Sequence, residues 1–152
     1  MSLAYCLGMF LTLIHELGHA LTAKLLVDAP INMIIGSHSR DNILVQLPGI
    51  ALAGFIPGVG KAYFSYPAEN YSPLKSAIIF LAGPICGAIA SYIAYKKLSQ
   101  YNRLYITKAV SIYGIVNNGP GSITDIWLNG RPNDCAKAVS ELKKYFNEPQ
   151  IA

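Results

Sequence analysis

Residues 2–27, SLAYCLGMFLTLIHELGHALTAKLLV, decide the fold because they predict one long apolar helix that carries His15, Glu16 and His19. Pro30 follows shortly after this stretch and disfavours helical geometry in the residue before it. We therefore expect the helix to end near Val27. The two histidines are four residues apart, which places their rings on the same side of a helix, with the glutamate beside them.

The pentapeptide His15-Glu16-Leu17-Gly18-His19 predicts a metal site. Two imidazoles one helical turn apart can bind one Zn²⁺ ion, and a glutamate next to the first histidine can act as the general base of a peptidase. The alternative is a chance match on an ordinary core helix. Unpaired histidine and glutamate are costly in apolar surroundings, which favours the metal site.

A catalytic zinc ion usually has three protein ligands and leaves its fourth position to water. Asp125 is the candidate third ligand, because it follows a Gly/Pro-rich break in an apolar context where an unpaired carboxylate would be costly. The alternative for Asp125 is a cap on the helical segment that begins at residue 126.

The composition favours lipid surroundings. Hydrophobic residues make up 53% of the 152-residue chain and charged residues 13%, about half the usual charged share, and the mean hydropathy is +0.36. Residues 76–95 carry no charge and are long enough to cross a bilayer core. We therefore expect an integral, multi-pass protein of the lipid bilayer. A soluble zinc peptidase with a buried helix is the alternative, against which this uncharged stretch argues.

Charge and cysteine usage exclude two other classes. The net charge of +4 comes from basic residues spread between and after the apolar stretches, without the clustered patch that nucleic-acid binding requires. The three cysteines, an odd number without paired spacing, predict free thiols instead of a disulfide framework or zinc ligands.

The expected fold is a mainly α membrane protein with a three-helix transmembrane core. After the first helix, β-prone runs at 31–35 and 43–47 predict a small β-hairpin, and the Gly/Pro-rich, uncharged residues 42–60 predict a bent or re-entrant element. The second helix should cover residues 74–98, with small residues around Gly83 that allow another helix to approach closely.

A third span is expected over residues 104–116, resuming at 122–128 after a Gly/Pro break. Asn133 is a predicted cap for a short last helix over residues 134–146. These patterns divide the chain into a membrane-embedded core, residues 1–128, and an amphipathic C-terminal tail helix within residues 129–152.

Three blocks of the sequence resemble the site-2 protease family of intramembrane zinc metalloproteases. They are the pentapeptide His15-Glu16-Leu17-Gly18-His19, the tripeptide Ala82-Gly83-Pro84, and the spacing of Asn117, Pro120 and Asp125. Their order and separation also agree with the family. Four positions depart from its pattern. Ile126 and Gly87 stand where the family often has glycine and asparagine, and Asn118 and Gly119 stand where it often has apolar residues.

The resemblance implies one Zn²⁺ ion held by His15, His19 and Asp125, with Glu16 as the catalytic base. It also implies that Asn117 holds the substrate backbone or the oxyanion; the alternative for Asn117 is a helix-breaking residue that satisfies local backbone groups.

The implied substrate is a membrane protein or peptide that is cut in or near a transmembrane segment. We expect regulation to come from a membrane partner or from the supply of substrate. In the family a β segment is thought to pair with substrate as an added strand, a role that the expected hairpin would fill. The alternative is a hairpin that only caps the fold.

For the whole protein, the alternative is a catalytically silent membrane protein of the same fold that acts by binding a partner.

Overall fold

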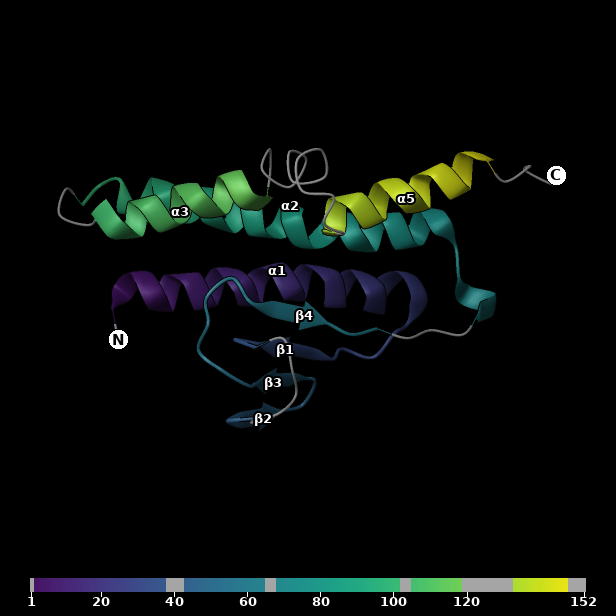
Figure 1. Cartoon of the computed structure of the whole chain (residues 1–152), viewed down its shortest axis with the longest axis horizontal. Helices are drawn as coiled ribbons and strands as arrows, with labels where there is room; N and C mark the ends of the chain where they lie inside the picture. The colour runs from purple at the N-terminus through teal and green to yellow at the C-terminus, as the bar shows by residue number, and fades with distance from the viewer. Residues whose placement is uncertain (1, 38–42, 65–67, 102–104, 119–132, 148–152) are drawn as a thin grey trace.

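The computed structural model describes residues 2–37, 43–64, 68–101, 105–118 and 133–147. In chain order its elements are α1 (Leu3–Val27), β1 (Met33–Ile35), β2 (Val45–Leu47), β3 (Ile50–Leu52), β4 (Gly60–Ala62), the short 3₁₀ helix η1 (Ala68–Asn70), α2 (Pro73–Leu98), α3 (Tyr105–Asn118) and α5 (Asp134–Asn147). Helix α1 lies between the small sheet and α2, while α3 and α5 follow one another along α2 (Figure 1). The expectation of a mainly helical chain is confirmed.

The first, second and last predicted helices begin and end within one residue of their predicted bounds, because local signals set them. At the start of α1 the Ser2 hydroxyl accepts the Tyr5 N–H. At its end Asp28 takes the left-handed conformation (φ 53°) and donates its N–H to the Lys24 carbonyl. The Asn133 side chain accepts the Ala136 N–H, which confirms the predicted cap of α5.

Small residues let α1 and α2 approach closely, as expected. A side-chain carbon at Gly18 would lie only 2.7 Å from the Ala82 carbonyl oxygen. Towards the end of α1, Ala23 and Val27 form a buried cluster with Ile79 of α2. The two helices therefore fix each other's position around the histidines.

The predicted hairpin is wrong in its pairing. Both β-prone runs do form strands, β1 and β2, but the sheet order is β2-β3-β1-β4, so β3 lies between them. Strand β3 is antiparallel to β2 and parallel to β1, and β4 is antiparallel to β1. The tight turn at Pro48 and Gly49 (φ +77°) explains this, because a two-residue loop closes β2 onto β3 with less entropy loss than the long connector would cost. Residues 42–60 thus supply two strands where a bent or re-entrant element was expected.

The sheet packs one face on α1 and leaves one edge of β4 open. Met33 and Ile35 are buried against Ala20 of α1. On the opposite side of β4 from β1, no further strand pairs with it among the described residues. Strand β4, the edge strand closest to α1, is therefore paired on one side only within the part of the chain that the structure describes.

Helices α1 and α2 are long and apolar enough to cross a membrane, a test that core helices of soluble proteins also pass. Helix α3 has 14 residues, which gives a length of about 21 Å and is short for a bilayer core of about 30 Å. The predicted continuation at 122–128 and the residue Asp125 lie outside the described residues.

The predicted tail helix, α5, packs against α2, with Ala138 fully buried. Its first residue reaches the histidines of α1.

Candidate metal centre

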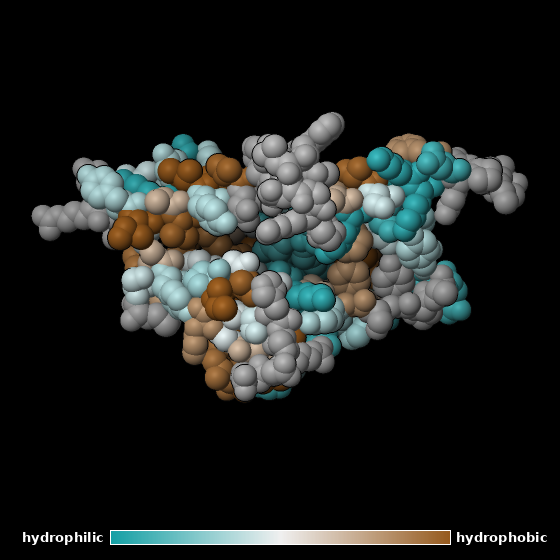
Figure 2. Space-filling model, in the orientation of Figure 1, coloured by the Kyte–Doolittle hydropathy of each residue, from teal (hydrophilic) through white to brown (hydrophobic). Residues whose placement is uncertain are grey.

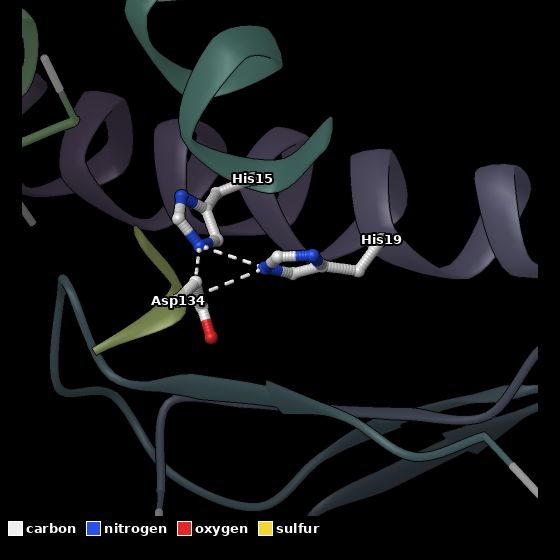
Figure 3. A group of neighbouring side chains, drawn as sticks. All are labelled: His15, His19 and Asp134. Carbon is white, nitrogen blue, oxygen red and sulfur yellow. Dashed lines mark hydrogen bonds and ion pairs between the residues drawn. The ribbon is translucent and has the colours of Figure 1, made fainter. Parts of the chain in front are cut away.

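Three side chains from the two ends of the chain converge on one point (Figure 3). The Nε2 atoms of His15 and His19 are 3.2 Å apart, and the Asp134 Oδ2 atom lies 3.3 Å from the first and 3.1 Å from the second. The side chain of His19 is 5% exposed, that of His15 19% and that of Asp134 27%. The cluster is thus shielded on the His19 side and accessible on the other.

The outer nitrogens of both rings are already engaged. The Nδ1 of His19 donates to the Ile79 carbonyl at 2.7 Å, and since a carbonyl can only accept, this nitrogen carries the hydrogen. The Nδ1 of His15 lies 2.7 Å from Asn118 Oδ1. The Asn118 amide nitrogen donates to the Gly114 carbonyl at 2.8 Å, which fixes the orientation of that amide and makes Nδ1 of His15 a donor as well.

With both Nδ1 atoms protonated, each neutral ring presents an unprotonated Nε2 to the centre of the cluster. The Asp134 carboxylate adds a third acceptor, so lone pairs of three atoms face one another at about 3 Å. Such a group is repulsive unless a cation lies among its members, either a proton on one ring or a metal ion. This arrangement is the main reason to regard the cluster as a metal centre.

The spacing also fits a metal ion. Ligand atoms about 2.05 Å from a tetrahedral zinc ion are about 3.3 Å apart. The three observed separations, 3.1–3.3 Å, are close to that value. Two nitrogens and one carboxylate oxygen form a ligand set that zinc accepts, and the outer hydrogen bonds from both rings are the usual support for metal-binding histidines. The residues fit zinc without identifying it.

Two glycines of α2 make room for this arrangement. A side-chain carbon at Gly83 would lie 2.1–2.5 Å from three atoms of the His19 ring. One at Gly87 would lie 2.9 Å from the side chain of Asn118, the residue that orients His15. Gly87 therefore accommodates an asparagine from α3.

Asp134 is held in its charged form. Burial raises the pKa of its carboxyl, but a proton on either imidazole, which lets His15 or His19 donate to Oδ2, and the nearby Lys137 ammonium outweigh burial and hold the pKa well below its ordinary value. Lys137 lies one turn along α5, with its Nζ 3.0 Å from the other carboxylate oxygen. A charged carboxylate is the form that binds a metal ion.

Glu16 is 7% exposed and lies against the open edge of the sheet. Its carboxylate lies close to the backbone N–H of Ala62 in β4. A side-chain carbon at Gly60 would lie 2.8 Å from Glu16 Cγ, so only glycine allows this close contact. The glutamate is therefore positioned between the histidines and the edge strand.

A cavity of about 500 Å³ opens onto the centre from the N-terminal half of α1. His15, Glu16 and Asn118 form its inner end. Its walls come from α1, α3 and the turn at Pro57 and Gly58. The cluster is thus connected to a space large enough for part of a ligand.

The structure brings together three of the residues expected from the sequence, His15, Glu16 and His19. Asp125 lies outside the described residues, and the side chain of Asn117 is not described. The sequence did not predict that Asp134 and Asn118 belong to the site. A signal for Asp134 was available, since it is an acidic residue in the first turn of an amphipathic helix, but an ordinary helix start gives the same signal.

Comparisons with protein-family models, curated proteins and solved structures give no match. The functional assignment therefore depends on the residues and geometry of this chain.

Proposed function

We propose that this protein is a zinc-dependent intramembrane endopeptidase that hydrolyses peptide bonds in or near transmembrane segments of membrane proteins. The observation that carries the proposal is the convergence of three acceptor atoms of His15, His19 and Asp134 beside the buried carboxylate of Glu16. A metal-binding group next to a carboxylate that can act as a base is the arrangement that peptide hydrolysis requires.

In the proposed site, His15, His19 and Asp134 would hold the ion. Zinc would supply Lewis-acid polarisation of the scissile carbonyl and of a water molecule. The Glu16 carboxylate accepts a proton from the attacking water and then delivers it to the departing amine nitrogen. The Asn118 amide holds His15 in place, and because both of its polar groups are engaged, it does not serve the oxyanion.

The open edge of β4 is evidence that the substrate is a peptide. Tyr63 donates to the Asn32 carbonyl and Gly36 donates to that of Val59, so Gly60 and Ala62 point their backbone groups away from β1. The Ala62 N–H lies close to the Glu16 carboxylate. A peptide added as a strand at this edge would place its backbone beside the catalytic carboxylate.

The surface of α2 supports a membrane location. One side of this helix exposes large apolar side chains at spacings of seven, four and four residues, each 44–54% accessible: Ile78, Ile85, Ile89 and Ile93. The stripe is about 22 Å long and lies within a stretch free of charges. Figure 2 shows further apolar patches along α3 and on the outer strands of the sheet. Lipid contact would account for such surfaces, which are unusual in water.

The test compares wild type with Glu16→Gln, using Glu69→Gln in η1 as the matched control. Each protein is purified in detergent, its zinc content is measured, and cleavage of a model transmembrane peptide is followed by mass spectrometry. We expect Glu16→Gln to keep its zinc and lose at least about 100-fold in rate, because it removes only the base. The Glu69→Gln control should retain both the zinc content and the cleavage rate of wild type.

Wild-type cleavage rates in Glu16→Gln would overturn the proposal. Zinc-loaded wild-type protein that cleaves nothing would favour the catalytically silent alternative.

A further inference from the structure

We propose that the cavity between α1 and α3 binds the substrate residues on one side of the scissile bond and selects small, uncharged side chains there. This inference rests on the proposed peptidase function and adds a substrate class to it. The cavity occupies about 500 Å³ and reaches His15 and Glu16 at its inner end, so whatever fills it contacts the reacting groups.

The length of the cavity suits an extended peptide. Its α1 wall includes Ala4, Gly8 and Leu11 before it reaches His15, a spacing of three to four residues that follows one side of the helix. From Ala4 to Glu16 the helix rises about 18 Å. An extended strand covers that distance in about five residues.

The width of the cavity is set by close packing of its walls. At Gly8 a side-chain carbon would lie 2.8 Å from Pro57, so the turn before β4 approaches α1 directly. Thr12 fixes this turn, since its hydroxyl accepts the Gly58 N–H at 2.7 Å and donates to the Gly8 carbonyl at 2.9 Å. Because the turn is bonded to the helix, the cavity does not widen easily to admit bulky side chains.

The chemistry of the walls disfavours charge. Apart from Glu16, none of the lining residues carries a formal charge, and α3 contributes Val110, Tyr113 and Gly114. A charged substrate side chain would lose its hydration here without gaining a counter-ion other than the catalytic carboxylate. The far side of the centre is different, because Asp134 and Lys137 of α5 lie there. The two sides of the scissile bond therefore meet different surroundings.

The probe is a mixture of synthetic peptides randomised over ten positions, incubated with the purified full-length protein in detergent. Mass spectrometry identifies the residues on each side of every cleaved bond. On one side we expect Gly, Ala, Ser and Val to be enriched and the four charged residues to be depleted at least about tenfold.

Val110→Phe should narrow the cavity and cut cleavage beside Leu or Phe more than cleavage beside Gly or Ala, with the zinc content unchanged. Val116→Phe, on the same helix but outside the cavity lining, is the control and should cleave like wild type. Val110→Ala is the second variant, in case Val110→Phe fails to fold, and should admit larger residues.

A wild-type profile without a preference on either side, or a Val110→Phe profile identical to that of Val116→Phe, overturns the cavity assignment while leaving the peptidase intact. If zinc-loaded wild-type protein cleaves no peptide, both proposals fail.

Discussion

Gly83→Ala is the change that tests most directly how the fold holds the proposed metal ligands. The added carbon would lie 2.1 Å from Nε2 of His19, whereas ordinary contacts begin near 3.4 Å. The ring would have to move by about 1.3 Å, the difference between the two distances, but metal ligands tolerate errors of only about 0.2 Å. Alanine therefore removes His19 from the centre without altering any ligand.

Loss of a residue that hydrogen-bonds a metal ligand lowers metal affinity about 10–100-fold. Displacement of a ligand itself should lower the affinity further, so we expect the zinc Kd to rise at least about 100-fold. Overpacking should also lower the free energy of unfolding by about 1–3 kcal/mol. Alanine gains about 1 kcal/mol in helix propensity over glycine, which partly offsets this loss. Gly8→Ala has the same gain and a contact of 2.8 Å with Pro57, remote from the metal ligands, so it is the matched control.

The assay is a zinc titration against a competing chelator on detergent-purified protein, with helix content measured by circular dichroism. Cobalt substitution adds a second readout, because its visible spectrum reports the number and geometry of ligands. A Gly83→Ala protein that is as helical as wild type and binds zinc with the same affinity would refute this role of Gly83. Equal losses in Gly83→Ala and Gly8→Ala would also refute it, since they would reflect general destabilisation.

Two further predictions concern the ligand set and its support. Asp134→Asn should lower zinc affinity by about 100-fold or more, while Asp125→Asn should leave it near the wild-type value. The reverse result in the same titration would make Asp125, and not Asp134, the third metal ligand. Asn118→Leu removes the acceptor for His15 Nδ1 and should lower zinc affinity about 10–100-fold, whereas Asn118→Asp keeps an acceptor and should retain most of it. Equal zinc affinities in the two Asn118 variants would show that this hydrogen bond does not orient the ring.

The parts of the fold that were predictable depend on neighbours in sequence. The ends of α1, α2 and α5 follow from apolar periodicity, prolines and capping side chains within a few residues. Strand pairing depends on partners further away, and strands of three residues carry too little pattern to select them. The order of the sheet was therefore beyond local reasoning, although the Pro48-Gly49 turn was visible.

The candidate site also has a part that the sequence predicts and a part that depends on tertiary packing. His15 and His19 are one helical turn apart, so any helix brings them together, and the sequence sufficed to predict the pair. Neighbouring residues on a helix point about 100° apart, so the difference between Asn117 and Asn118 depended on how α3 packs against α2. Asp134 is 115 residues from His19, and no local rule could join them.

The sequence by itself determined an apolar helix with two imidazoles and a carboxylate on it, because a helix converts fixed spacing into fixed geometry. Only the tertiary structure decided what completes the site. Gly83 lets α2 approach closely enough for Ile79 to accept from His19, α5 brings Asp134 to both rings, and β4 presents its open edge to Glu16. These contacts join distant segments through packing of small residues, and packing depends on the whole chain.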